Sequence, residues 1–359
     1  MSCLGVVRSR AVGHALLWLA LATLPLGGQS LTYERVTVAE GIHLFLGPDP
    51  GAGNAVAIVS DGEALVVDAT ASPRSADAII DDLVRLGVRR LRGIVNSHWH
   101  QGHIWGNQAF LERFPAAPVI AHRKTRDDIR DFAVPDLAVQ IGRIRARLAE
   151  RDSLLRIGLN ASGEVMTETE RGAVEQRQIL FRDLVEGLEA VEPELPQITF
   201  EQTVTVQVGV LTVTLTHLGP AHSFGDVVAH VPERGVLIAG DLVTKPYPAA
   251  AEGFSSIVGW LSALDTLQSM DFDLLIPGHG DLVRDPREYL ADLQGLMTSV
   301  VDQTRDGIER GSDAETIASD LDISAFADAH VPDDERQRAA FQAFFVQPAV
   351  AIAYRELNR

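Results

Sequence analysis

Short apolar runs separated by turn residues fill residues 36–119 and predict a strand-rich layer. The runs lie at residues 43–46, 55–59, 64–67 and 91–95. Residues 75–86 instead carry apolar side chains at helical spacing, so a helix is expected between the third and fourth runs. The first third of the chain therefore predicts strands interleaved with helices.

A second strand-rich half begins after Pro196. Val204, Val206 and Val208 alternate with polar residues. Gly209 turns the chain, and Leu211, Val213 and Leu215 alternate on the return, which predicts a hairpin with one buried face. Further strands are expected at residues 227–231, 236–239 and 274–276, with a helix at 255–270. Two such halves predict an α/β fold of two mixed sheets packed together, with helices outside.

Two other regions predict helices. Residues 123–195 are dense in Arg, Asp and Glu and carry apolar residues at helical spacing, which predicts two or three helices with a turn at 158–163. We expect this insert to cover one face of the core; the alternative is a lid beside a functional cleft. The last eighty residues predict helices packed on the domain, with residues 301–359 as a C-terminal extension. Their apolar face carries Leu290, Leu293, Met297 and Val300.

Residues 1–30 have the order of a secretory signal peptide. Arg8 and Arg10 precede an apolar run at residues 15–26, which small residues follow. The run is too short to span a bilayer comfortably, so a retained anchor is the weaker alternative. We therefore expect a periplasmic or secreted protein whose main domain, residues 31–300, has no stable membrane span after cleavage.

Composition narrows the chemistry. The formal net charge of −18 over 359 residues argues against a nucleic-acid partner, because phosphate binding needs clustered Lys and Arg. A small molecule is the expected partner, and the sequence does not specify an oligomeric state. Cys3 is the only cysteine and lies in the segment expected to be cleaved. A metal site in the mature protein must therefore use His and carboxylate ligands.

Three histidines follow the strand expected at 91–95. His98, His100 and His103 lie within six residues, and imidazole is the commonest metal-ligating side chain. His222, Asp241 and His279 also follow apolar strands and are flanked by Gly or Pro, which allow the tight turns that bring side chains into one cleft. The six residues together predict a metal site.

This order of residues resembles the metallo-β-lactamase superfamily of hydrolases, whose motif is His-x-His-x-Asp-His. The resemblance covers about residues 34–300 and includes the strand that ends at Asp68. It implies a four-layer αβ/βα sandwich with the metals in the cleft between the sheets.

The resemblance also implies a role for each residue. His98, His100 and His222 would hold a first zinc, Asp241 would bridge, and His103 and His279 would hold a second zinc. Asp68 would orient a ligand or its loop. Three neutral imidazoles with one open position are typical of a catalytic zinc, whose bound water has a pKa of about 7.

Gly102 departs from the motif. The family has an Asp here that ligates the second metal, and glycine offers no ligand. The second site should therefore bind metal more weakly, while the first stays intact. Neighbouring Gln101 is expected to point elsewhere, and Asp226 to be structural.

The remaining candidates lie around the site. His122 and His217 are expected to be structural histidines rather than ligands. Lys245 is expected either to pair with an anionic group of the substrate or to be solvated. Trp99 and Trp105 should pack around the site, with Trp99 at its rim.

The leading hypothesis is an exported zinc-dependent hydrolase that uses a metal-bound hydroxide on an ester, lactone, thioester or amide, with a β-lactam as a further candidate. One alternative is a mononuclear iron oxidoreductase of the persulfide dioxygenase type. The other is a degenerate relative that binds metal without turnover, which Gly102 motivates. The sequence does not specify the substrate, because specificity in this architecture depends on loops and on the insert.

Overall fold

The computed structural model describes residues 33–48, 52–160 and 162–358. The expected signal peptide and Cys3 lie outside these residues. None of the helices in the described ranges combines the length and the apolar composition of a membrane span.

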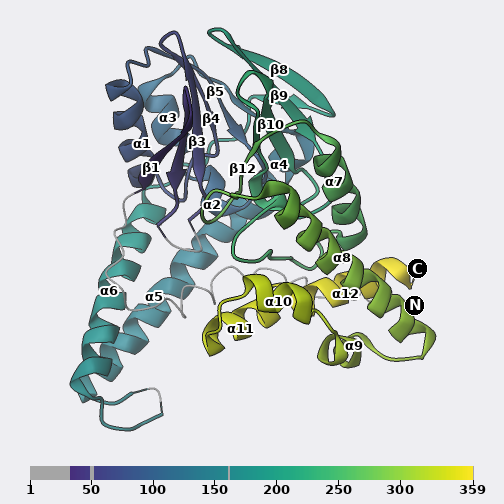
Figure 1. Ribbon diagram of the computed structural model, residues 1–359. Helices are drawn as coiled ribbons and strands as arrows, with labels where there is room; N and C mark the ends of the chain where they lie inside the picture. Colours follow the sequence, from purple (N-terminus) through teal and green to yellow (C-terminus); the bar gives the residue numbers. More distant parts are fainter. Residues whose placement is uncertain (1–32, 49–51, 161, 359) are drawn as a thin grey trace, which may run out of the picture.

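Two β-sheets face each other at the centre (Figure 1). The first sheet has seven strands in chain order, antiparallel from β1 to β4 and parallel from β4 to β7. They are β1 Glu34–Ala39, β2 Ile42–Leu46, β3 Ala55–Ser60, β4 Glu63–Val67, β5 Arg90–Asn96, β6 Val119–His122 and β7 Ile198–Phe200.

The second sheet has five strands in the order β12-β11-β10-β9-β8. They are β8 Thr203–Val208, β9 Leu211–His217, β10 Val227–Val231, β11 Val236–Ile238 and β12 Leu274–Ile276. Only the β11–β12 pair is parallel. The predicted hairpin at Gly209 is confirmed, with φ +55° at this glycine.

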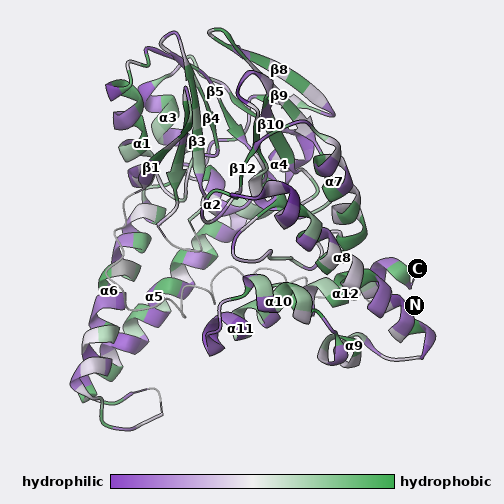
Figure 2. Cartoon of the chain, in the orientation of Figure 1, coloured by the Kyte–Doolittle hydropathy of each residue, from purple (hydrophilic) through white to green (hydrophobic). Residues whose placement is uncertain are grey.

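Alternation along the strands divides the core into layers. On β3, Val56 and Ile58 pack toward the second sheet, whereas Ala55 and Ala57 pack toward the outer helices of the first sheet. This period of two is what a strand buried on both faces requires. Figure 2 shows the resulting hydrophobic strands between helices whose outer faces are polar. The predicted α/β sandwich of two mixed sheets is confirmed.

Helices cover the outer faces of both sheets. On the first sheet, α1 (Pro73–Arg85) and α3 (Asn107–Arg113) contribute to an apolar cluster with β3 to β6. On the second sheet, α7 (Ile257–Ser269) and α8 (Pro286–Glu309) pack with β11 and β12. Short helices α2 (Gln101–Ile104), η4 (Pro232–Arg234) and η5 (Gly240–Leu242) lie in the connections.

The C-terminal helices share the core of the second sheet. They are α9 Ala314–Asp320, α10 Ser324–His330, α11 Glu335–Phe341, the π-helix η6 Gln342–Val346 and α12 Gln347–Leu357. The predicted apolar face of α8 is confirmed, because Leu290, Leu293, Met297 and Val300 are all buried in one cluster with α7 and α12. Helix α8 runs continuously across residue 300, so the extension continues directly from the domain.

The insert packs at a different place from the one that we expected. Its helices α4 (Arg123–Asp128), η3 (a π-helix, Ile129–Ala133), α5 (Val134–Ile157) and α6 (Glu168–Glu189) confirm the predicted helices and turn. The pair α5 and α6 does not cover a face of either sheet but extends away from them (Figure 1). Its apolar side packs on Trp99, Ile104 and Trp105, because these side chains of the histidine segment leave an apolar surface that the sheets do not cover.

Stacked histidines join the ends of the two sheets. His122 at the end of β6 and His217 at the end of β9 have ring centroids 3.7 Å apart and nearly parallel rings. His217 donates from Nε2 to the Phe224 carbonyl at 3.1 Å. The expectation that these histidines are structural fits this arrangement. Burial and the neighbouring His217 lower the pKa of His122 to about 4.

This pair predicts a pH dependence of stability. The unfolded chain binds a proton at His122 near pH 6.5, whereas the folded protein does so only near pH 4. The stability from neutral His122 is therefore present above pH 6.5 and lost as pH falls toward 4, by at most about 1.4 kcal/mol per pH unit. Urea unfolding from pH 7.5 to 4.5 should show a shallower loss in His122→Phe than in wild type. His230→Phe, which removes a histidine outside the pair, is the control for loss of an imidazole, and an unchanged slope in His122→Phe would contradict the account.

Candidate metal centre

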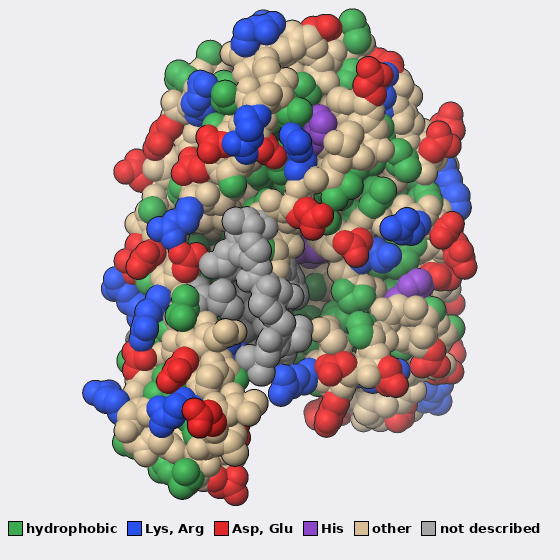
Figure 3. All heavy atoms as spheres, turned by 60° about the vertical axis from the view of Figure 1, so that its left-hand side comes forward, with side chains coloured by type: hydrophobic (Ala, Val, Ile, Leu, Met, Phe, Trp, Pro, Cys, Tyr) green, Lys and Arg blue, Asp and Glu red, His purple; other side chains and the backbone are tan. Residues whose placement is uncertain are grey.

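Six side chains from both halves of the chain meet where strands of the two sheets end. His98 and His100 follow β5, and His103 lies on α2. His222 lies between β9 and β10, Asp241 lies in η5 after β11, and His279 follows β12. All are buried except His279, whose side chain is 17% exposed. Figure 3 shows a face of the molecule on which a histidine side chain is visible within a hollow.

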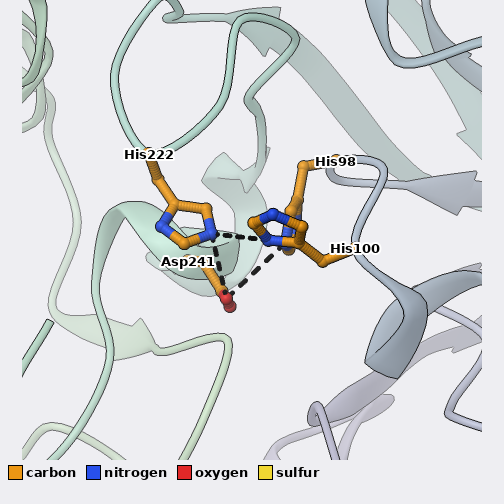
Figure 4. Close-up of side chains that lie close together, drawn as sticks. All are labelled: His98, His100, His222 and Asp241. Atoms are coloured by element: carbon orange, nitrogen blue, oxygen red, sulfur yellow. Dashed lines mark hydrogen bonds and ion pairs between the residues drawn. The ribbon is translucent and has the colours of Figure 1, made fainter. Parts of the chain in front are cut away.

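The first cluster comprises His98, His100, His222 and Asp241 (Figure 4). The Nδ1 atom of His100 lies 3.0 Å from His98 Nε2 and 2.9 Å from His222 Nε2. Oδ2 of Asp241 lies 3.6 Å from His98 Nε2 and 3.4 Å from His222 Nε2. One ligand atom from each of the four residues therefore lies within 4.8 Å of the others.

Hydrogen bonds on the far sides of two rings fix their tautomers. Ser97 Oγ donates to Asp68 Oδ2 at 2.7 Å, so at 3.0 Å it accepts from Nδ1–H of His98. Nδ1–H of His222 donates to the Ala249 carbonyl at 3.0 Å. Both Nε2 atoms of the neutral rings then carry lone pairs that face the same point. Such convergent lone pairs fit a divalent cation, which would lie among them.

The second cluster comprises His103, Asp241 and His279. The Nε2 atoms of the two histidines are 3.2 Å apart. Oδ1 of Asp241 lies 3.4 Å from His103 Nε2, and Oδ2 lies 3.4 Å from His279 Nε2. Buried Oδ1 of Asp241 has no hydrogen-bond partner in the described part of the chain, which a cation would supply. Asp241 thus belongs to both clusters, as the bridging role requires.

Asp68 connects the two clusters. Its Oδ2 lies 2.9 Å from His103 Nδ1 and accepts from Ser97, which in turn holds His98. Its Oδ1 accepts from the Ser97 amide at 2.8 Å. The backbone of Asp68 is left-handed, with φ +64°, a strained conformation that is typical of functional sites. Asp68 therefore orients a histidine of each cluster. It contacts His103 directly and holds His98 through Ser97.

Sequence reasoning missed Ser97 and Gly53, and it treated Gly278 only as a turn residue beside His279. A Cβ at Gly53 would lie 2.3 Å from His103 Cε1, and a Cβ at Gly278 would lie 2.0 Å from Asp241 Oδ1. Glycine at these positions leaves room for the two side chains. The position of Ser97 directly before His98 was a usable signal, whereas the clash at Gly53 involves residues fifty positions apart and is visible only in the fold.

Burial and charge separate the two clusters electrostatically. Burial lowers the pKa of His98 and of His100 well below their ordinary value, so both rings are neutral at pH 7. Burial opposes protonation of His103 too, but Asp241 and Asp68 outweigh it and raise its pKa to about 8. Burial would raise the pKa of Asp241, yet the surrounding histidines hold it well below its ordinary value. The first cluster is therefore ready to bind a cation at pH 7, whereas His103 must first lose a proton.

Gly102 leaves the second cluster with three protein ligands. It is buried on α2 between Gln101 and His103. Gln101 Oε1 accepts from Gln140 Nε2 on α5, so its side chain points to the insert, as expected. Asp226 accepts from the Ser223 amide at 2.8 Å and from its hydroxyl at 2.6 Å, which fits the expected structural role.

The other candidates lie around the clusters. Nζ of Lys245 lies 5.6 Å from the centroid of the Tyr289 ring, so its pairing with a substrate stays a prediction. Trp99 and Trp105 are buried, as expected of packing residues, but the expected rim position of Trp99 is wrong, because only 5% of it is exposed. The Trp99 ring contacts that of His100 with centroids 4.6 Å apart.

A family model and two curated relatives match parts of this chain. The model of the metallo-beta-lactamase superfamily matches residues 48–279. A linear primary-alkylsulfatase from Pseudomonas sp. is 21% identical over 264 residues, which are 69% of this chain and 46% of that protein. A hydroxyacylglutathione hydrolase from Gloeobacter violaceus is 38% identical over 71 residues, 20% of this chain and 28% of that protein. The chain thus spans less than half the length of either relative.

Solved structures share the fold. The inverting sec-alkylsulfatase Pisa1 from Pseudomonas sp. has a TM-score of 0.59 at 14% identity, over 90% of this chain and 50% of that chain. A metallo-beta-lactamase from Pontibacter korlensis has a TM-score of 0.51 at 14% identity, over 74% of this chain and 99% of that chain. These likenesses show the shared fold, and the superfamily match to residues 48–279 shows that the chain belongs to the metallo-beta-lactamase superfamily.

Proposed function

We propose that the protein is a metal-dependent hydrolase that binds a first metal tightly and a second metal more weakly. His98, His100 and His222 would hold the first metal, His103 and His279 the second, and Asp241 would lie between them. The observation that carries this proposal is the pair of ligand groups, buried except for His279, that share Asp241. Zinc is the proposed metal, because imidazole and carboxylate with an open position form its catalytic sites.

The protein's own residues would prepare the site for hydrolysis. A divalent metal bound here would supply an activated water and polarise the bond to be cleaved. Burial keeps the rings of His98 and His100 neutral, so their lone pairs are available. Asp68, directly or through Ser97, and the Ala249 carbonyl hold three rings in the ligating tautomer. These contacts limit rotation of the rings, which would otherwise weaken binding.

The substrate class is part of the proposal. We propose an ester, lactone, thioester or amide as the cleaved group, with a β-lactam as a further candidate. The similarity to an alkylsulfatase adds sulfate esters to the panel that should be tested. We also propose that the protein is exported, on the basis of residues 1–30.

One observation supports the alternative of an iron oxidoreductase. The second cluster consists of two histidines and one carboxylate, which is the donor set of many non-haem Fe(II) oxygenases. Iron in the purified protein, together with oxygen consumption on a thiol substrate, would support this alternative over hydrolysis.

Removing one histidine from each cluster tests the assignment. His222→Ala should lower the affinity for the first zinc by more than about a hundredfold and abolish hydrolysis, because two imidazoles remain where three converge. His279→Ala should lose only the second zinc, which binds more weakly. Zinc titration against a chromophoric chelator, with hydrolysis of the ester and sulfate-ester panel, measures both effects. Wild-type affinity in His222→Ala would rule out the proposed first site.

Gly102→Asp tests the weakness of the second site. An added carboxylate beside His103 should raise the affinity for the second zinc about tenfold or more, because it supplies the missing anionic ligand. Gly102→Asn, which adds nearly the same volume without charge, is the control and should give little gain. Equal affinity in Gly102→Asp and wild type would show that the second site does not lack a ligand at this position.

A further inference from the structure

The segment 247–256, which we call the His222 loop, surrounds one histidine of the first cluster. Its Ala249 carbonyl accepts from His222 Nδ1–H at 3.0 Å. Its Ser255 hydroxyl donates to the His222 carbonyl at 2.6 Å and accepts from the Ala251 amide at 2.9 Å. The Ser256 amide donates to the Ala221 carbonyl at 2.8 Å. Both the ring and the backbone of His222 are therefore fixed by this loop.

The C-terminal helices hold the other side of the His222 loop. The Ala250 amide, next to the carbonyl that His222 contacts, donates to the Phe344 carbonyl at 2.9 Å. Phe344 lies in the π-helix η6, and π-helical turns are frequent at functional sites. Near the start of the loop, the Tyr247 hydroxyl donates to Gln337 Oε1 of α11 at 3.0 Å. Arg355 of α12 pairs with Glu252 at 3.4 Å.

Glu356 fixes the point where the loop ends. Its Oε2 accepts from the amides of Ile257 and Val258 at 3.1 Å each, at the start of α7. These amides have no partner within the helix, and a carboxylate at a helix N-terminus also interacts favourably with the helix dipole. Across the described residues, no hydrogen bond or ion pair joins Glu356 to a cluster residue. Glu356 therefore reaches the metal site only through neighbouring segments, namely the His222 loop that ends here and α7, whose Trp260 ring lies 5.4 Å from the His222 ring.

We propose that the C-terminal helices position His222, so that metal affinity at the first cluster depends on residues beyond 279, where the superfamily match ends. The path runs from Glu356 and Phe344 through the His222 loop to the Ala249 carbonyl and the ring of His222. Loss of a partner that orients a ligating histidine costs about 10- to 100-fold in metal affinity. The inference rests on the proposed metal centre.

Three variants test this path. Glu356→Ala should weaken binding of the first zinc about tenfold, measured by chelator competition. Glu356→Gln retains an oxygen acceptor for the two amides and should restore most of the affinity. Gln303→Ala is the matched control, because Gln303 makes two hydrogen bonds with the backbone of Asp322 among the C-terminal helices and none to the loop. Gln303→Ala should lower the thermal midpoint without lowering the affinity for zinc.

A second readout does not require metal. In protein labelled with ¹⁵N-histidine, the Nδ1–H signal of His222, assigned by its loss in His222→Gln, should exchange faster with water in Glu356→Ala than in wild type or Gln303→Ala. The inference would be overturned if Glu356→Ala changed neither the exchange rate of His222 Nδ1–H nor the affinity for zinc. It would also be overturned if Glu356→Ala and Gln303→Ala lowered the affinity for zinc equally. A wild-type protein that binds no zinc would overturn the proposed function instead, and the exchange rates would still decide whether the helices position His222.

Discussion

The structure depends on the convergence of five imidazoles on one buried carboxylate. Asp241 lies within 3.6 Å of ligand atoms from His98, His103, His222 and His279, and His100 completes the set. The Nε2 lone pairs of His98 and His222 converge with the Asp241 carboxylate on one point, an arrangement that suits a cation. The surrounding elements serve this arrangement. Asp68 and Ser97 orient rings, Gly53 and Gly278 leave room for side chains, and the His222 loop fixes the ring of His222.

The two clusters are chemically unequal, and this asymmetry bears on function more than the family fold does. The first has three imidazoles, two of them held in a ligating tautomer, and its histidines are neutral at pH 7. The second has three ligands, lacks a carboxylate at Gly102, and contains His103, whose pKa is about 8. A family fold alone does not determine how many metals a member holds or what it acts on. Here the residues themselves favour one tightly bound metal at the first cluster, and the C-terminal helices help to position its ligand His222.

Much of the fold and of the site was readable in the sequence. Short apolar runs, with a period-two pattern at residues 204–215, predicted most of the strands, and the six candidate ligands come together as their places at strand ends predicted. The tautomers did not follow from the sequence, because they depend on Ala249 and Asp68, which are distant in the chain from the rings they hold. The position of the insert did not follow either. Its apolar residues predicted helices correctly, but their packing on Trp99 and Trp105 depends on an apolar surface that forms only in the folded protein.

The most direct test of the account is anomalous X-ray diffraction from crystals of the purified protein, with data above and below the zinc edge. The account predicts a strong zinc peak about 2.0–2.1 Å from Nε2 of His98, Nδ1 of His100 and Nε2 of His222, and a weaker or absent peak at His103 and His279. A zinc-loaded protein with no peak at the first cluster, or with full occupancy at the second cluster alone, would contradict it.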